Sequence, residues 1–462
     1  FFSHSRPAGP HALRAAGLRM QHVIRRGLRS RCQQFRARKC FSTGLDSVVD
    51  SAAAHERVVS ETGAKAWNLQ FKDGAIFTHR LDFHNGREKG AAPLFRVMDL
   101  TGNIVNDEGD PHLSRDHCRR ILRAMHRSNV MDSILYDAQR QGRLSFFMTH
   151  YGEEGSIIGA TAGLDDNDMV YCQYREAPVL IYRDYSIAQM LAQCTGSGAD
   201  RTKGRQMPIH YASPEHNFQA VSACLATQIP NAAGAGYAFR LEGLDRIVCC
   251  FFGEGASSEG DFHAGMNFAA TLGCQTLFLC RNNGYAISTP ALEQYAGDGV
   301  YIRGLAYGMR SLRVDGNDVL AVVAAVRRAR ELILEHKAPV LIEAMTYRGG
   351  HHSTSDDAGR YRSKDEQDVW VKSLNPIKRF QKYCIEQGHW SSEDTARVQQ
   401  EMREEVINSL GENEKLPKWP IETLFHDVYA APAPHLARQQ EALLKHLQEF
   451  RDEYPSLGGG DH

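Results

Sequence analysis

Short apolar stretches alternate with longer amphipathic stretches from about residue 169 onward. The clearest apolar stretches are Ile247–Phe252, Thr276–Cys280 and Val340–Ala344, and turn residues bound each of them. Stretches of this length and composition predict buried β-strands. Helices are predicted at Glu259–Leu272 and from Val319 to about His336. The alternation is typical of an α/β fold in which helices flank a parallel sheet.

Helical patterns also occupy the regions before and after this alternation. Apolar residues recur near helical spacing over Ser114–Asp137 and predict a helix there. Two charged amphipathic helices are predicted at Glu393–Leu410 and Leu436–Phe450. We therefore expect a main domain at 45–400 and a helical C-terminal region at 401–462.

Length and composition support a folded core. The chain has 462 residues, of which 42% are hydrophobic, and a chain of this length can bury a large core. No apolar run approaches the roughly 18 residues needed to cross a bilayer, so no membrane span is predicted. The 11 cysteines include no C-x-x-C pair, which favours reduced thiols over a disulfide framework or a zinc ribbon.

The net charge of −1 conceals an asymmetry along the chain. Residues 1–44 contain 10 Lys or Arg and no Asp or Glu, so the remainder carries about −11. An Arg-rich segment without acids, ending near Arg38–Ser42, predicts a mitochondrial transit peptide and a matrix location. The alternative is a disordered basic arm. Nucleic-acid binding is disfavoured because no zinc-finger spacing or basic helix follows.

The main chemical motif lies at the ends of two successive predicted strands. Gly253-Glu254-Gly255 follows the first strand, and Asn282-Asn283 ends the next, with 26 residues between the two groups. Ligands bind at strand ends of parallel sheets, so the Glu254 carboxylate and the Asn283 amide oxygen should meet there. Both are oxygen ligands that suit Mg²⁺. Glycines and a helix N-terminus near Glu259 would admit a phosphate, so the motif predicts a site for a Mg²⁺-bridged diphosphate.

Gly253-Glu254-Gly255 alone would more often be a plain turn. Because Asn282-Asn283 follows at the next strand end, a site for a Mg²⁺-bridged diphosphate is favoured instead. A dinucleotide fingerprint fails its spacing test because Ser258 occupies the position of the third glycine. The arrangement resembles the thiamine-diphosphate motif, with Glu254 in place of the usual aspartate.

From about Tyr151 to Lys364 the chain resembles the α subunit of branched-chain 2-oxo acid dehydrogenases. The segments that carry the resemblance are Tyr174–Ala177, Tyr182–Tyr185, Lys203–Pro208, Leu225–Pro230, Cys280–Pro290 and His351–Asp357. The pyruvate dehydrogenase α subunit is the nearest alternative. Its pattern continues Asn-Asn with Arg-Tyr-Gly-Met-Gly, where this chain has Gly-Tyr-Ala-Ile-Ser, so the branched-chain family is favoured.

The resemblance implies a thiamine-diphosphate-binding fold and a set of site residues. Mg²⁺ would be bound by Glu254, Asn283 and the main-chain carbonyl of Tyr285. The cofactor contacts that it implies come from Tyr174, Arg175, Leu225, Gly255, Ala256, Arg281 and His352. Guanidinium groups suit phosphate oxygens. Without the resemblance, the arginines would be interpreted as members of surface ion pairs and His352 as a loop histidine.

A monovalent-cation site, for K⁺, is implied at Ser222, Thr227 and Gln228. The family usually has Ser-Pro where this chain has Ala223-Cys224, so one hydroxyl that would reach the diphosphate is missing. Cys224 could alternatively be a small core residue.

The implied reaction is oxidative decarboxylation of branched-chain 2-oxo acids, with acyl transfer to a lipoyl group of an E2 component. Thiamine diphosphate supplies the carbanion chemistry, and His352 is a candidate for proton handling. The glutamate that activates the cofactor is expected from a β subunit, in an α2β2 heterotetramer. A catalytically silent paralogue is the alternative in another functional class.

The polar segment Gly349–Lys364 is predicted to be an exposed, mobile loop. Within it, Ser353 and Ser363 match the family's regulatory phosphorylation positions, which implies a kinase and a phosphatase as partners. A phosphate beside a diphosphate site would repel the cofactor and lower activity.

Overall fold

The computed structural model describes residue 81 and residues 92–454. The chain divides into two compact units, Phe1–His84 and Asn85–His462, and the account below concerns the second. The predicted transit peptide at 1–44 lies outside the described residues. The proposed boundaries of the main domain and the C-terminal region stay predictions.

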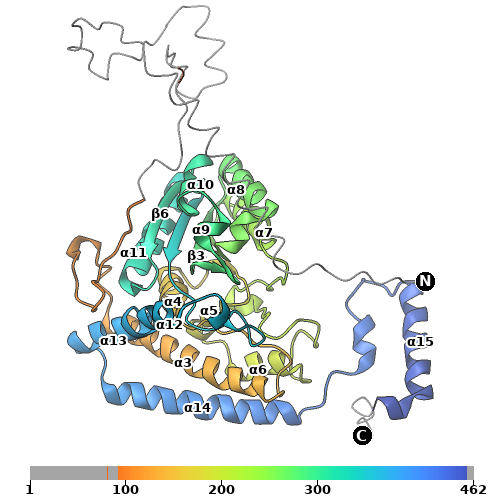
Figure 1. Ribbon diagram of the computed structural model, residues 1–462. Helices are drawn as coiled ribbons and strands as arrows, with labels where there is room; N and C mark the ends of the chain where they lie inside the picture. Colours follow the sequence, from red (N-terminus) through yellow and green to blue (C-terminus); the bar gives the residue numbers. More distant parts are fainter. Residues whose placement is uncertain (1–80, 82–91, 455–462) are drawn as a thin grey trace, which may run out of the picture. The chain divides into compact units, whose positions relative to one another are not determined.

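A five-stranded parallel sheet forms the centre of the second unit (Figure 1). Its strands, in spatial order, are β1 (Met169–Tyr171), β2 (Val248–Gly253), β3 (Thr276–Asn282), β7 (Val340–Met345) and β6 (Arg310–Asp315). Every neighbouring pair is parallel. The three strands singled out from the sequence are confirmed as β2, β3 and β7, and they are the three inner strands.

Both faces of the sheet are covered by helices, because the inner strands are apolar on both faces. Phe251 and Leu279 belong to one buried cluster, together with residues of α4 (Glu154–Gly163) and α11 (Val319–His336). The second cluster contains alternate strand residues such as Phe252 and Phe278, with residues of α7 and α8. These two helices span Gln228–Leu241 and Gly260–Leu272 and pack against each other. The α/β fold with a flanked parallel sheet is confirmed.

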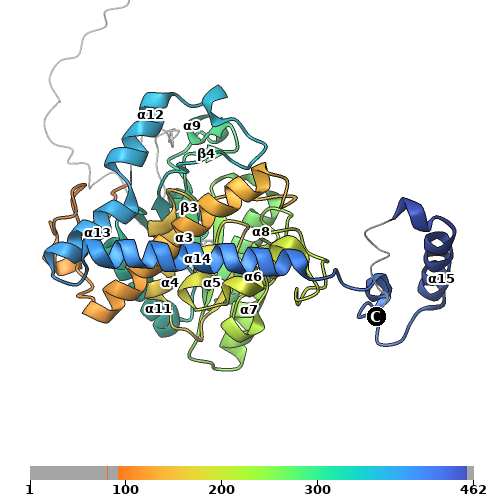
Figure 2. The ribbon, with the colours of Figure 1, turned by 90° about the horizontal axis from the view of Figure 1, so that it is seen from below.

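Long helices extend the layer on the α4 side. α3 (Arg115–Arg140) begins after Ser114, whose hydroxyl accepts a hydrogen bond from the backbone N–H of His117 at 3.3 Å. α14 (Ser392–Lys415) packs against α3 and α6 (Ile187–Thr195), as Figure 2 shows. The predicted helices in both regions are confirmed, with α14 longer than expected at each end.

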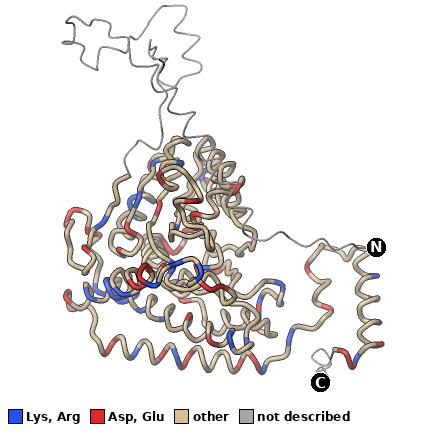
Figure 3. The backbone as a smooth tube through the Cα atoms, in the orientation of Figure 1, with Lys and Arg blue, Asp and Glu red and all other residues tan. Residues whose placement is uncertain are grey.

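The remaining elements are short or lie near the C-terminus. They are α5 (Ala177–Tyr182), α9 (Ala291–Gln294), α10 (Tyr301–Ala306), α12 (Lys364–Asp368), α13 (Pro376–Glu386), α15 (Pro434–Glu449) and the antiparallel pair β4 (Tyr285–Ala286) and β5 (Thr289–Pro290). Figure 3 shows acidic and basic residues interspersed along the described chain, α14 included.

Two further observations concern the cysteines and the helices of the described residues. The nine cysteines among the described residues are all free thiols, and eight of them are buried. Within residues 92–454 no helix combines the length and the apolar character that a membrane span requires.

Candidate functional site

The predicted motif residues meet where β2 and β3 end. Gly253 on β2 is in register with Arg281 on β3, so the residues that follow these strands emerge side by side. The backbone N–H of Asn283 donates a hydrogen bond to Oε2 of Glu254 at 3.2 Å. The expected juxtaposition of Glu254 and Asn283 is therefore confirmed.

Glu254 is a buried carboxylate with one oxygen free. Its side chain is 1% exposed, and Oε1 has no hydrogen-bond partner in the structure. Burial raises the pKa of Glu254 to about 7, because a low-dielectric environment disfavours the charged form. A cation next to Oε1 would offset this cost, so the carboxylate suits a metal ion.

Asn283 adds an amide oxygen to this place, and Tyr285 lies next to it, with its carbonyl accepting from Arg348 Nη1 at 3.4 Å. Asn283 Nδ2 donates to Glu153 Oε1 at 2.8 Å, which orients the amide, and its Oδ1 accepts from the Tyr285 N–H at 3.2 Å. Within residues 92–454, no cluster of three or more His, Cys, Asp or Glu side chains could hold a metal ion. A metal here would therefore combine one carboxylate with amide and main-chain oxygens, a set that Mg²⁺ accepts.

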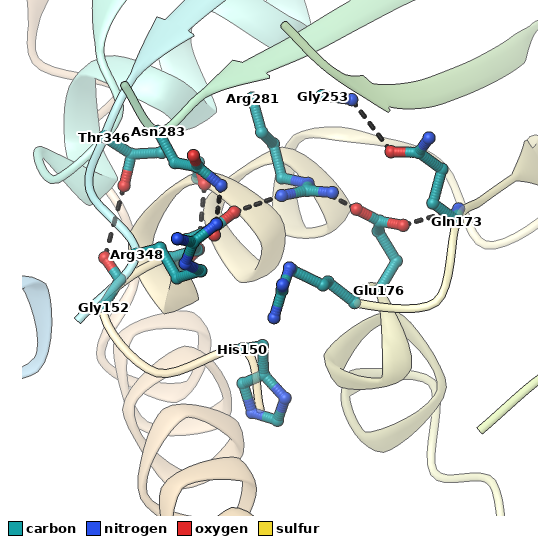
Figure 4. A network of polar contacts seen from close by, with 12 residues as sticks. His150, Gly152, Gln173, Glu176, Gly253, Arg281, Asn283, Thr346 and Arg348 are labelled. Atoms are coloured by element: carbon teal, nitrogen blue, oxygen red, sulfur yellow. Dashed lines mark hydrogen bonds and ion pairs between the residues drawn. The ribbon is translucent and has the colours of Figure 1, made fainter. Parts of the chain in front are cut away.

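Arg281 lies between two buried carboxylates (Figure 4). Its Nη1 contacts Glu153 and its Nε contacts Glu176, and all three side chains are 2% exposed or less. Although burial acts in the opposite direction, Glu176 and Glu153 raise the pKa of Arg281. The interpretation of this arginine as a member of a surface ion pair is wrong, because both of its partners are inside the protein.

Arg175 is also buried and contacts His352. Its guanidinium donates to the carbonyls of Thr149 and His352, the latter at 2.7 Å, and Nη2 lies 3.1 Å from His352 Nδ1. Because arginine can only donate, Nδ1 acts as the acceptor and the imidazole proton is assigned to Nε2. Tyr174 packs edge-on against the same imidazole, with ring centroids 6.1 Å apart.

His352 is neutral at physiological pH. Burial, followed by the positive charges of Arg175 and Arg348, lowers the pKa of His352 to about 3. Its backbone N–H donates to Asp356 Oδ2 at 2.7 Å, which fixes the loop around it. The imidazole is therefore held as a neutral group with a defined tautomer.

Sequence reasoning missed the acidic and amide residues that hold these groups. Gln173 Oε1 accepts from the Gly253 N–H at 2.9 Å, and the backbone N–H of Gln173 donates to Glu176 Oε2 at 2.6 Å. Glu153 and Glu176 have no signature spacing of their own. Adjacent acids after a glycine, as in Gly152-Glu153-Glu154, resemble an exposed turn, so only their burial in the fold distinguishes them.

The prediction that residues 349–364 form an exposed loop is wrong in part. Arg348, which precedes this segment, and Arg362, which lies within it, are 1% and 3% exposed. Arg348 donates to the Ile287 carbonyl at 2.6 Å, and Arg362 donates to the Gly350 carbonyl at 2.5 Å. Main-chain carbonyls satisfy these guanidiniums inside the protein. Ser353 is half-buried, whereas the side chain of Ser363 is exposed.

The segment proposed for a monovalent cation leads into α7. Ser222 and Leu225 are exposed, Thr227 Oγ1 donates to the Cys224 carbonyl at 2.8 Å, and Gln228 Nε2 donates to the Phe251 carbonyl at 3.0 Å. The last contact places this segment next to β2, near Glu254. Cys224 is exposed, so the alternative that it is a core residue is wrong.

Comparison with known proteins gives a consistent family. The model of the family described as "Dehydrogenase E1 component" matches residues 122–422. The chain is 50% identical over 381 residues to the mitochondrial 2-oxoisovalerate dehydrogenase subunit alpha of Homo sapiens, covering 82% of this chain and 86% of the relative. The proteins of the same name are 47% identical in Caenorhabditis elegans, covering 83% and 89%, and 47% identical in Dictyostelium discoideum, covering 90% and 93%. The chain belongs to the dehydrogenase E1 component family.

Proposed function

We propose that this chain is the α subunit of a mitochondrial branched-chain 2-oxo acid dehydrogenase and holds the diphosphate and metal end of thiamine diphosphate. The observation that carries the proposal is the buried Glu254 carboxylate, whose Oε1 lacks a partner, beside Asn283 at adjacent strand ends. Relatives with the same name in animals and an amoeba support the branched-chain assignment.

The residues present fit a Mg²⁺ ion. Glu254 Oε1, Asn283 Oδ1 and the Tyr285 carbonyl would hold it, with water and phosphate oxygens completing the near-octahedral set that Mg²⁺ prefers. Gly255 packs closely against β4, since a Cβ built there would lie 3.0 Å from the Cβ of Ala286. When bound, thiamine diphosphate supplies the carbanion chemistry of the decarboxylation.

The diphosphate would be held by buried guanidinium groups. Two of the three nitrogens of Arg281 contact Glu153 and Glu176, which leaves Nη2 for an anion. The other residues that we propose to contact the cofactor are Tyr174, Arg175, Leu225, Gly255, Ala256 and His352. Guanidinium forks match phosphate oxygens, and their fixed orientation avoids reorganisation when the anion binds.

His352 is proposed to have a proton-handling role during acyl transfer, as a donor to the reacting oxygen. Its Nδ1 is engaged by Arg175, so Nε2–H is the group available to donate. The pKa of about 3 keeps the imidazole neutral before the step. The neutral imidazole keeps this proton: Nε2–H would donate a hydrogen bond to the reacting oxygen and stabilise the negative charge that develops there.

A K⁺ ion is proposed to bind the segment before α7. Ser222, Thr227 and Gln228 supply hydroxyl and amide oxygens, and the Gln228 amide nitrogen is already occupied by the Phe251 carbonyl. The amide oxygen of Gln228 therefore points away from that hydrogen bond and can serve as a ligand. A bound cation would fix the segment that carries Leu225.

The chain is proposed to act with two protein partners. A β subunit would supply the glutamate that activates the aminopyrimidine ring, in an α2β2 heterotetramer, and a lipoyl-bearing E2 would accept the acyl group. The names of the relatives describe each as a subunit alpha, which supports an assembly with a second kind of subunit.

Phosphorylation of Ser353 and Ser363 by a kinase, reversed by a phosphatase, is proposed to regulate the site. Ser353 directly follows His352, so a phosphate there would add about −1.5 to −2 charges beside the diphosphate site. Ser363 caps α12, where its hydroxyl accepts from the Glu366 N–H at 3.1 Å.

The test is reconstitution with a β subunit of a relative, followed by measurement of CO₂ release from 3-methyl-2-oxobutanoate and from pyruvate. We expect a strong preference for 3-methyl-2-oxobutanoate that depends on thiamine diphosphate and Mg²⁺. A preference for pyruvate would favour the pyruvate dehydrogenase alternative. A stable complex that turns over neither acid would favour a catalytically silent paralogue.

A further inference from the structure

A buried acid–histidine pair lies outside the residues assigned above. Asp132, on α3, is 3% exposed, and His150, in the segment before α4, is 2% exposed. Oδ2 of Asp132 accepts the backbone N–H of His150 at 2.7 Å, and Oδ1 lies 3.1 Å from the imidazole Nδ1. The backbone N–H of His150 is thus hydrogen-bonded to the carboxylate, and the imidazole lies close to its second oxygen without forming a hydrogen bond with it.

The segment held by this pair contacts both arginines of the site. The carbonyl of Thr149 accepts from Arg175, and the carboxylate of Glu153 contacts Arg281. Between them, the His150 carbonyl accepts the Glu153 N–H at 3.0 Å. Residues 149–153 therefore supply one contact to each guanidinium group, and Figure 4 shows the His150 side chain below Arg281.

Other contacts of the segment come from the opposite side. Thr346 Oγ1 donates to the Gly152 carbonyl at 3.2 Å, and the Gly349 N–H donates to the Tyr151 carbonyl at 2.8 Å. These contacts connect the segment to residues that follow β7. On the α3 side, Asp132 accepts the backbone N–H of His150, and without this hydrogen bond the Thr149 carbonyl would be held less firmly relative to Arg175.

A carboxylate in this place is unfavourable for stability. Burial raises the pKa of Asp132 well above its usual range, and apolar residues in a core avoid that desolvation cost. Despite this cost, the carboxylate is kept, and the hydrogen bond that it accepts holds residues 149–153, which contact both arginines. A positioning role explains why a polar pair occupies this part of the core.

We propose that Asp132 and His150 are positioning residues for the diphosphate-binding guanidiniums of Arg175 and Arg281. The inference rests on the proposed function, because it concerns the same thiamine diphosphate site. It assigns no contact between the pair and the cofactor. The pair acts through the Thr149 carbonyl and the Glu153 carboxylate, so its loss should weaken cofactor binding more than binding of the 2-oxo acid.

The experiment compares variants of the reconstituted α2β2 complex. The dissociation constant of thiamine diphosphate at saturating Mg²⁺ is measured by tryptophan fluorescence, and KM for 3-methyl-2-oxobutanoate is measured separately. Asp132→Leu should weaken cofactor binding by about tenfold, the lower end of the range for residues that orient ligand-binding groups, with KM for the oxo acid changed less than twofold. Asp132→Asn keeps an acceptor for the His150 N–H and should restore most of the affinity.

Ser197→Ala is the matched control. It removes a buried side-chain hydrogen bond of 2.8 Å to Asn413, and it should lower stability while leaving cofactor affinity unchanged. If Asp132→Leu does not assemble, His150→Ala removes only the imidazole contact and should weaken cofactor binding by a few fold. Wild-type affinity for thiamine diphosphate in the Asp132→Leu complex would overturn the proposal. If Asp132→Leu does not assemble, wild-type affinity in the His150→Ala complex would overturn it instead. A wild-type complex that binds no thiamine diphosphate would instead overturn the proposed function.

Discussion

Replacing Glu254 with glutamine should change how the stability of the metal-free protein depends on pH. The side chain is 1% exposed, Oε2 accepts one hydrogen bond from the Asn283 N–H, and Oε1 has no partner. Glutamine has the same size and carries no titratable proton. The variant therefore isolates the contribution of the carboxylate charge.

The expected magnitude follows from the pKa of Glu254, which burial raises from 4.5 to about 7. A pKa raised in the folded state means that the folded protein holds its proton more tightly than the unfolded chain. Stability from this group is fully present below pH 4.5 and is lost as pH rises through about 7. A rise of roughly 2.5 in pKa corresponds to about 3 kcal/mol at high pH. Most of this loss should occur between pH 5 and pH 8.

The assay is urea denaturation of the complex in EDTA at pH 5, 6, 7 and 8. The free energy of unfolding of Glu254→Gln, minus that of the wild type, should increase by about 2–3 kcal/mol from pH 5 to pH 8. Adding Mg²⁺ and thiamine diphosphate at pH 8 should stabilise the wild type and have much less effect on the variant.

Glu154→Gln is the matched control for this prediction. Glu154 is fully buried, its pKa is also raised to about 7 by burial, and Oε2 accepts from the Gly152 N–H at 2.9 Å. Glu154→Gln should show the same increase in the free energy of unfolding, relative to the wild type, as pH rises. It should still be stabilised by Mg²⁺ and thiamine diphosphate as much as the wild type is. A difference that does not grow with pH for Glu254→Gln would refute the burial argument. A full Mg²⁺ response in that variant would refute the metal assignment.

Four further outcomes are expected. Arg281→Lys should lower the free energy of unfolding by about 3–5 kcal/mol, measured by urea denaturation, because one ammonium group cannot bridge two buried carboxylates; an unchanged midpoint would contradict this. Ser363→Ala should remove the cap of α12, at a cost of about 1 kcal/mol, seen as faster amide exchange over Lys364–Asp368 and not elsewhere. His352→Ala should bind thiamine diphosphate but lose acyl transfer to a lipoyl acceptor, and full transfer would exclude the proton-handling role. Ser353→Glu should lower CO₂ release, whereas Ser353→Ala should not; equal rates would show that charge at this position has no effect.

The sequence predicts the central sheet well because local signals and burial agree there. β2, β3 and β7 are continuous apolar runs, as fully covered strands must be. α11 begins and ends where predicted, since Asp318 caps it by accepting from the Ala321 N–H at 3.1 Å. The edge strand β6 was not singled out, because Arg310–Asp315 alternates polar and apolar residues and lacks a continuous apolar run.

The site was predictable only where a strand end carries its functional residue. Glu254 and Asn283 follow β2 and β3 directly, so their meeting follows from the parallel order of the strands. Glu153 and Glu176 come from segments whose spacing carries no signal, and they reach Arg281 only through tertiary packing. The sequence therefore predicts which groups meet at the strand ends and does not predict the buried acids that contact them.

The same distinction applies to the buried arginines, for which the sequence allows both a surface ion pair and a phosphate-binding role. A surface arginine exchanges partners with water, whereas Arg175, Arg281 and Arg348 each have carbonyl or carboxylate partners inside the protein. Burying three guanidiniums near one place is unfavourable unless an anion joins them, because like charges repel more strongly where water is excluded. Two carboxylates hold Arg281, while Arg175 and Arg348 meet only neutral carbonyls, hydroxyl and imidazole groups. Asp356, which accepts the His352 N–H, is one carboxylate beside these two guanidiniums, so positive charge remains in excess on the side of His352, where a diphosphate would contribute to the stability of the folded site.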